Sequence, residues 1–158
     1  MRLTTFSDYA LRVLVYLGAR EGKNATIGDI AGAYGISSNH LMKVVHHLAR
    51  GGYVATTRGK GGGMRLARAP EEINLGAVVR GSEDGRLVEC FDRASSGCRL
   101  EPACALRGML AEALEAFFAV LDRHTLADLL RPRARLAKVL FVAPTRTRGA
   151  VRPVPVAR

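Results

Sequence analysis

The sequence predicts a mainly α-helical fold with a small β wing. Two short stretches with helical spacing of apolar residues, 26–34 and 38–50, are separated by a turn that contains glycine, which is typical of a helix-turn-helix. A glycine-rich basic hairpin follows them, and a long amphipathic stretch runs to residue 122. We therefore predict a winged helix-turn-helix domain over 1–80, a cysteine loop over 81–104, a dimerisation helix region over 102–130 and a basic, flexible tail over 131–158.

The first helix is expected from Ser7, whose hydroxyl can cap it, to about Arg20. Leu11, Leu14 and Leu17 recur at helical spacing and predict one apolar face.

The second and third helices have recognisable start and stop residues. Thr26 followed by Asp29 resembles a capping box, and Gly35 ends the second helix. The third helix is expected to begin at Ser37 or Ser38 and to end at Gly51.

A hairpin is predicted directly after the third helix. Residues 53–57 and 64–68 have strand-like composition, and the glycine-rich turn 58–63 separates them. This turn joins two strands and lacks the Gly-Lys-Ser/Thr ending of a nucleotide-binding loop. Asn74 then caps a short helix that runs to about Arg80.

The last long helix is predicted from residue 102 or 103 to Asp122, and it would extend roughly 28 Å at 1.5 Å per residue. Its apolar residues recur at steps of four, four, three and four; they are Leu106, Leu110, Leu114, Phe117 and Leu121. A small domain cannot cover so long a stripe alone, so we expect the seam of a homodimer, with intrachain core as the alternative. Thr125 and Asp128 then begin one more short helix.

Composition excludes several classes of protein. No apolar run in the 158 residues reaches the length of roughly 18 residues that a membrane span needs, and the first residues lack the apolar core of a signal peptide. We therefore expect a cytoplasmic protein that does not bind membranes. No pairing of histidine with cysteine and no nucleotide motif indicates an enzyme.

The net charge of +10 is unevenly distributed. Residues 36–68 hold six basic residues and no acidic one, and residues 131–158 hold eight and none, whereas residues 69–130 hold eleven acidic and six basic residues. A basic block inside a folded domain suits the phosphate backbone of DNA.

The basic block supplies candidate DNA contacts. Ser38, Asn39, His40 and Lys43 lie near the start of the third helix, the part that reaches base edges in the major groove, and Arg50 at its far end suits a phosphate. In the wing, Arg58, Lys60 and Arg65 supply charge for the minor groove or its phosphates. One of His46 and His47 is expected to pack in the core.

The three cysteines, Cys90, Cys98 and Cys104, fall within fifteen residues. An odd number argues against a disulfide framework and favours a metal or redox role. Thiolates suit an iron–sulfur cluster or zinc, and the spacing is not the Cys-x2-Cys knuckle of structural zinc. Three thiolates leave one cluster iron without a protein ligand, so another side chain, a solvent molecule or a small ligand must complete the site.

Four stretches carry a resemblance to a known family: Thr5–Arg12, Tyr34–Val45, Arg58–Gly63 and Leu87–Asp92. The chain resembles the NsrR-type nitric-oxide-sensing repressors, which belong to the winged-helix iron–sulfur regulators that also include IscR. The resemblance covers residues 1 to about 130. It implies a homodimeric repressor that binds a palindromic operator in double-stranded DNA and releases it when nitric oxide reacts with an iron–sulfur cluster.

The resemblance also implies the ligands. Cys90, Cys98 and Cys104 match the cysteine ligands of a cluster, most often [4Fe–4S] and alternatively [2Fe–2S]. Asp8 matches an oxygen ligand donated by the partner subunit. IscR-like members use a histidine three places after the last cysteine, where this chain has Arg107, so the NsrR-type site is favoured.

Two other functions remain open for the same fold. One is a regulator that responds to iron supply or redox state through the same loop. The other is a zinc-stabilised DNA-binding module without sensing.

Overall fold

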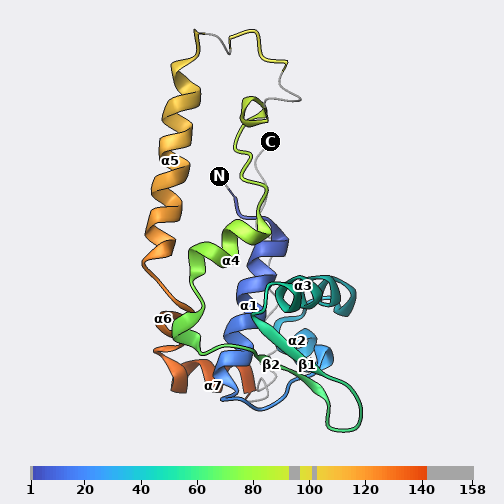
Figure 1. Ribbon diagram of the computed structural model, residues 1–158. Helices are drawn as coiled ribbons and strands as arrows, with labels where there is room; N and C mark the ends of the chain where they lie inside the picture. Colours follow the sequence, from blue (N-terminus) through green and yellow to red (C-terminus); the bar gives the residue numbers. More distant parts are fainter. Residues whose placement is uncertain (1, 93–96, 101–102, 142–158) are drawn as a thin grey trace, which may run out of the picture.

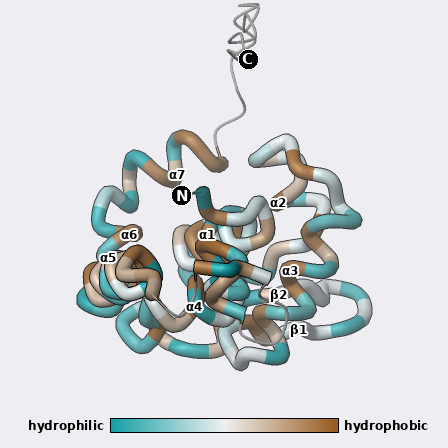
Figure 2. The backbone as a smooth tube through the Cα atoms, turned by 90° about the horizontal axis from the view of Figure 1, so that it is seen from above, coloured by the Kyte–Doolittle hydropathy of each residue, from teal (hydrophilic) through white to brown (hydrophobic). Residues whose placement is uncertain are grey.

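A computed structural model describes residues 2–92, 97–100 and 103–141. Short helices and a two-stranded hairpin pack around α1 (Thr5–Ala19), and the long helix α5 (Ala105–Asp122) extends away from this body on one side (Figure 1). Viewed along α5, helix α3 (Ser38–Arg50) lies on the other side of α1 (Figure 2). The predicted fold class, mainly helical with a small wing, is confirmed.

The N-cap of helix α1 lies three residues earlier than the sequence predicts. Thr4 is its N-cap, and the Thr4 hydroxyl oxygen accepts a hydrogen bond from the backbone N–H of Ser7 at 3.2 Å. Ser7 itself is fully buried, and its hydroxyl donates to the Ser82 hydroxyl at 2.8 Å. Both residues can cap a helix, and Thr4 does so because Ser7 is used in a contact with a neighbouring helix.

The hydrophobic core lies where α1 is covered by its neighbours. Leu14 of α1, Leu41 and Leu48 of α3 and Leu126 of α6 (Leu126–Leu130) are each at most 1% exposed. Burying one such side chain contributes about 1.5–3 kcal/mol. Helix α3 is therefore held firmly against α1 by its apolar side.

The helix-turn-helix forms as predicted. Helix α2 (Ile27–Tyr34) has the expected capping box, in which the Asp29 N–H donates to the Thr26 hydroxyl at 3.1 Å and the Thr26 N–H donates to the Asp29 carboxylate at 2.8 Å. Gly35 ends the helix with φ of 64°, a left-handed conformation that favours glycine. Ser37 is the N-cap of α3.

The wing is a hairpin of β1 (Val54–Thr57) and β2 (Gly63–Leu66), in which Val54 pairs with Leu66 and Thr57 with Gly63. Both strands are shorter than predicted. The base of the hairpin is fixed to the segment before α2, because the Met64 N–H donates to the Ala25 carbonyl at 2.7 Å and the Ala25 N–H donates to the Met64 carbonyl at 2.9 Å. The wing turn therefore projects from a firm base.

A short helix and two 3-10 turns connect the wing to α5. The turn η1 (Pro70–Glu72) precedes α4 (Leu75–Ser82), and η2 (Glu89–Phe91) follows it. Asn74 caps α4 as predicted, accepting from the Ala77 N–H at 2.9 Å. The predicted capping box of Thr125 and Asp128 likewise begins α6.

Helix α5 is mostly exposed, and Phe118 is its one buried residue. Of the predicted seam, Leu110, Leu114, Phe117 and Leu121 are half-buried by the chain's own residues. A different stripe of small and apolar side chains is exposed at alternating steps of three and four: Leu106, Met109, Ala113, Ala116 and Val120. The chain therefore covers part of the expected seam and leaves a neighbouring face open. Among the described residues no helix is long and apolar enough to span a membrane.

The basic segment after residue 130 differs from the prediction of a flexible tail, because α7 (Arg133–Phe141) is helical and packs on α1. Leu136 and Leu140, one helical turn apart, pack against the core. The Phe141 ring lies 5.2 Å from the Tyr16 ring, and Arg133 pairs with Glu21 at 3.1 Å. These contacts stabilise the helix, which the sequence does not predict because the segment has few apolar residues. Residues 142–158 lie outside the described part.

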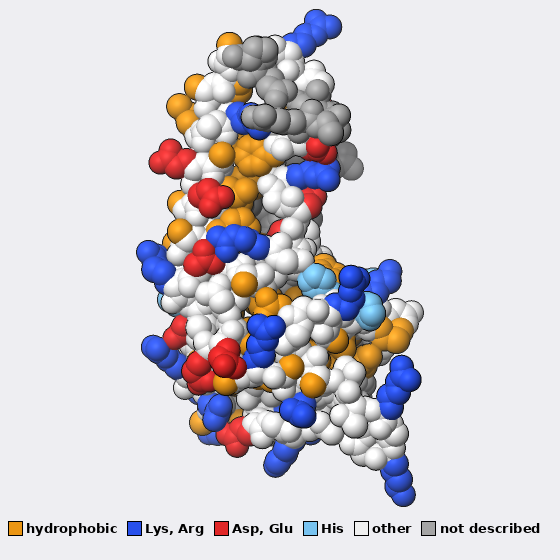
Figure 3. Space-filling model, viewed as in Figure 1, with side chains coloured by type: hydrophobic (Ala, Val, Ile, Leu, Met, Phe, Trp, Pro, Cys, Tyr) orange, Lys and Arg blue, Asp and Glu red, His pale blue; other side chains and the backbone are white. Residues whose placement is uncertain are grey.

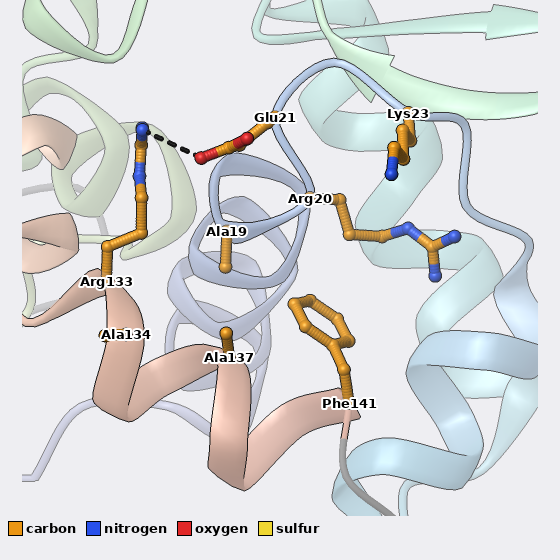
Figure 4. A pocket seen from close by; sticks show the side chains of 8 residues that line it. All are labelled: Ala19, Arg20, Glu21, Lys23, Arg133, Ala134, Ala137 and Phe141. Atoms are coloured by element: carbon orange, nitrogen blue, oxygen red, sulfur yellow. Dashed lines mark hydrogen bonds and ion pairs between the residues drawn. The ribbon is translucent and has the colours of Figure 1, made fainter.

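A groove of about 690 Å³ separates α7 from the end of α1 (Figure 4). Ala19 and Ala137 form its floor, and Arg20, Lys23 and Arg133 lie around it. The Arg20 guanidinium lies beside two rings that contact each other, with its central carbon 5.8 Å from the Tyr16 centroid and 5.7 Å from that of Phe141. This arginine therefore fastens α7 to α1.

Candidate nucleic-acid interface and cysteine loop

Helix α3 presents a polar stripe on the side opposite the core. Its buried residues, Leu41, Val44, Val45 and Leu48, all face α1 and its neighbours. The exposed polar side chains are three consecutive residues at the start of the helix and three more at steps of three or four; they are Ser38, Asn39, His40, Lys43, His46 and Arg50. The structure thus brings all five predicted contact residues of this helix to one accessible side.

His46 belongs to this stripe as well, in addition to the five predicted contact residues. The steps from Asn39 through Lys43 and His46 to Arg50 are four, three and four residues, and this helical spacing is the pattern that identifies it. His47 is half-buried, with its ring centroid 5.3 Å from that of Phe6. His47 is therefore the histidine that packs inward.

The wing adds exposed cations beside the α3 stripe. Arg58 and Lys60 lie in the turn and Arg65 on β2, and all three side chains are exposed. Lys and Arg side chains project from the lower right of the molecule, where the wing lies (Figure 3). Gly59 and Gly61 have φ of 95° and 80°, which the tight turn requires and which favour glycine.

This surface has the shape and charge to bind a nucleic acid. A protruding helix fits the major groove, which is about 12 Å wide, and a basic hairpin beside it reaches the adjacent backbone. Residues 36–68 contain no carboxylate that would repel phosphate.

The three cysteines lie near the end of α5 that is farthest from the body (Figure 1). Cys90 is in η2, Cys98 follows in the described segment 97–100, and Cys104 is the N-cap of α5. All three are free and half-buried. Within the described residues of this single chain, no group of three His, Cys, Asp or Glu side chains comes close enough to hold a metal ion.

Asp8 lies in the first turn of α1 and is paired with Arg12. The Arg12 Nε donates to Asp8 Oδ1 at 3.0 Å, and Nη2 lies 2.8 Å from Oδ2. The hydrogen bond to Asp8 raises the pKa of Arg12. Both side chains are 44% exposed. Within one chain Asp8 is therefore accessible and is not brought together with the cysteines.

A groove of about 560 Å³ lies beside Cys104, and Phe91 and Arg107 line it together with that cysteine. Arg86 pairs with Asp92 at 3.1 Å and lines the same groove. The position three residues after the last cysteine therefore holds a side chain that faces the cysteine region but cannot ligate a metal, as the sequence indicates.

The donor set of this loop fits an iron–sulfur cluster. Three unpaired thiols with partial solvent access are the ligands that iron–sulfur chemistry uses, and they lie on a segment with little regular structure around them. A further ligand would come from outside this set.

Comparison with known proteins gives one family. Residues 3–132 match the family model Rrf2, described as an iron-dependent transcriptional regulator. The chain is 53% identical over 142 residues to the HTH-type transcriptional regulator NsrR of Geobacillus kaustophilus (strain HTA426), which covers 89% of this chain and 97% of the relative. It is 50% identical over 142 residues to the NsrR of Bacillus subtilis (strain 168), with the same coverage.

Solved structures agree with this result. T. potens IscR superposes with a TM-score of 0.66 at 25% identity, covering 84% of this chain and 88% of that one. Oxidized CymR of Staphylococcus aureus superposes with a TM-score of 0.65 at 25% identity, covering 83% of this chain and 97% of that one.

Proposed function

Because the chain belongs to the Rrf2 family of transcriptional regulators, we propose that it is a repressor that senses nitric oxide through an iron–sulfur cluster. Membership of this family makes it a DNA-binding regulator and not an enzyme. The observation that carries the finer proposal is the loop of three free, half-buried cysteines in a chain about half identical to regulators named NsrR.

The α3 stripe and the wing bind the operator in this proposal. Asn39 and Lys43 contact base edges, and Ser38 and His40 support them at the start of the helix. Arg50, Arg58, Lys60 and Arg65 contact phosphates or the minor groove. These contacts give one subunit one half-site.

A homodimer would place two half-sites side by side on a palindromic operator. Helix α5 supports this assembly, because an isolated helix of its length is marginal in water and it has one buried residue out of 18. The exposed stripe that includes Met109, Ala113 and Val120 has the three-and-four spacing at which two helices pack.

The cysteines and Asp8 would hold the cluster, with [4Fe–4S] as the proposed form and [2Fe–2S] as the alternative. Such a cluster, when bound, supplies iron that reacts with nitric oxide. Cys90, Cys98 and Cys104 supply thiolates, and Asp8 of the partner supplies an oxygen, which is a harder ligand than sulfur. Asp8 is accessible for this role and must exchange its ion pair with Arg12 for the metal bond.

Helix α1 can pass a change at Asp8 to the DNA-binding surface. Asp8 lies one residue before the Tyr9 side chain, whose ring centroid is 6.4 Å from that of His40 on α3. The Phe6–His47 contact joins the same two helices. A shift of the first turn of α1 therefore displaces the start of α3.

The test compares the chain prepared without oxygen before and after nitric oxide is added. We expect a coloured protein that loses its visible absorbance and most of its affinity for operator DNA together. Cys98→Ala should lack the colour and the response, whereas the neighbouring Arg99→Ala should keep both. Asp8→Ala should weaken the response more than the iron content.

Four outcomes would contradict the proposal. A colourless, iron-free protein that binds its operator tightly, or a Cys98→Ala variant that still responds to nitric oxide, would exclude cluster sensing. Stoichiometric zinc would favour a DNA-binding module without sensing. A response to oxidants or iron chelation but not to nitric oxide would favour the redox or iron-status alternative.

A further inference from the structure

Helix α5 is attached to the rest of the molecule near its C-terminal end. Phe118, its buried residue, lies four residues before that end, whereas the first half of the helix rises past α4 and faces residues 84–92 across the groove that Arg107 lines (Figure 1). The contacts between α4 and the end of α5 therefore determine the direction in which the helix projects.

Arg80 of α4 forms a bidentate ion pair with Asp122, the last residue of α5. Its Nη1 donates to Asp122 Oδ1 at 2.6 Å and its Nη2 to Oδ2 at 2.7 Å. The same guanidinium stacks on Phe118, with its central carbon 4.4 Å from the ring centroid. A planar two-point contact fixes direction as well as distance, and the ring fixes the plane of the guanidinium.

Glycine and backbone contacts hold the two segments at close range. A side chain at Gly76 would overlap the Asp122 carboxylate, so only glycine allows this approach. The Asn74 side chain donates to the Asp122 carbonyl at 2.7 Å. Backbone bonds from Leu75 to His124 at 3.0 Å and from Leu126 to Ile73 at 2.8 Å tie the same segments together.

Stability alone does not account for the Arg80–Asp122 pair. The two side chains are 42% and 39% exposed, and ion pairs this accessible contribute little to the free energy of unfolding. Their shared geometry, however, leaves α5 little freedom to rotate or tilt. The pair is better suited to fixing an angle than to holding the fold together.

We infer that Arg80 is a positioning residue that sets the angle between α5 and the DNA-binding body, and so the half-site spacing that the dimer accepts. This inference rests on the proposed homodimer through α5. An 18-residue helix is about 27 Å long at 1.5 Å per residue. A rotation of about 7° at its base moves the far end by about 3.4 Å, the rise of one base pair. In a dimer joined along α5, a rotation of this size therefore moves one DNA-binding body relative to the other by a distance comparable with the rise of one base pair.

The test measures spacing preference with the full chain. A palindromic duplex that the wild-type protein selects from a random library is compared with versions in which the two halves are one base pair closer or farther apart. We expect the wild type to lose at least about ten-fold in affinity on either change, since each costs contacts in one half-site. Arg80→Ala should lose no more than about two-fold, while remaining a dimer in sedimentation.

Three further variants sharpen the result. Arg80→Lys keeps the charge but not the planar two-point contact, so it should behave like Arg80→Ala. Asp122→Asn leaves the side-chain size unchanged and tests the same contact if Arg80→Ala does not fold. Arg123→Ala removes an equal charge from the adjacent residue and should keep the wild-type preference.

The possible failures are distinguishable. If the Arg80 and Asp122 variants keep the wild-type loss of affinity on altered spacing, the inference is wrong and the dimer stands. If the wild type is monomeric, the proposed dimer fails and the inference fails with it. If the wild type is a dimer that ignores spacing, the inference alone fails.

Discussion

The DNA-binding surface and the cysteine loop differ in how much of each is built by one chain. The surface stands on α3, whose apolar side is buried in the core, and on a hairpin bonded at its base to Ala25. The cysteine loop, by contrast, has the short 3-10 turn η2, and none of its described residues is buried. The loop is held mainly by exposed contacts such as Arg86 with Asp92.

This difference shows what holds the side chains of each site in position. DNA recognition needs side chains that are held in position before the DNA binds, and burial of the apolar side of α3 fixes the residues on its exposed side. A site whose ligands come from a loop and from a second subunit gains its order from assembly and from the bound group. In the proposed function, the sensor can therefore change state while the reader keeps its fold.

The largest expected effect is a difference between the two regions in how much a substitution lowers the free energy of unfolding. Leu48→Ala removes a side chain that is 1% exposed and should lower the free energy of unfolding by about 2–5 kcal/mol. Cys98→Ser, in the half-buried loop, should change the stability of the metal-free protein by less than about 0.5 kcal/mol. Urea unfolding of both variants measures this. Equal costs would show that the loop is as much a part of the core as α3.

The next effect tests whether the sensor needs a partner. Ala113→Glu places a carboxylate in the exposed α5 stripe and should weaken the dimer about 100-fold or more, equivalent to about 2.8 kcal/mol. Sedimentation at several concentrations gives the dissociation constant. Ala111→Glu adds the same charge on the opposite side of the helix and serves as the control. If both variants dimerise equally well, α5 packs through a different face.

The smallest effect concerns the reading surface alone. Lys43→Ala should weaken specific operator binding by about ten-fold, or about 1.4 kcal/mol, without changing the unfolding free energy, because Lys43 is exposed on α3. Lys138→Ala, which removes an equal charge from α7, is the matched control. Fluorescence anisotropy with labelled duplex measures both. Equal losses would mean that the basic charge acts as a whole and not through the α3 stripe.

Local patterns in the sequence were enough to predict most of the body. The Thr26–Asp29 and Thr125–Asp128 capping boxes and the Asn74 cap form where the sequence places them, because a cap depends on residues within one turn. The turn glycines and the charge of residues 36–68 are equally local. The eight predicted DNA contacts are all exposed for the same reason, since the apolar spacing of α3 and the hairpin already defines their outer sides.

Where two nearby residues could each play the same structural role, contacts with residues distant in sequence decided which one does. Thr4, not Ser7, caps α1 because the Ser7 hydroxyl reaches Ser82. His47 packs inward because Phe6 lies beside it. Neither partner can be identified from spacing within one helix.

The sequence by itself determined the helix order, the basic reading surface and the chemistry of the thiol donors, because these follow from residue type and short-range spacing. Only the tertiary structure decided which side of α5 is left open, that residues 133–141 form a helix against α1, and that Arg80 grips Asp122 at the base of α5. These features require segments that are distant in the chain to meet, and no local pattern specifies which two surfaces pack against each other.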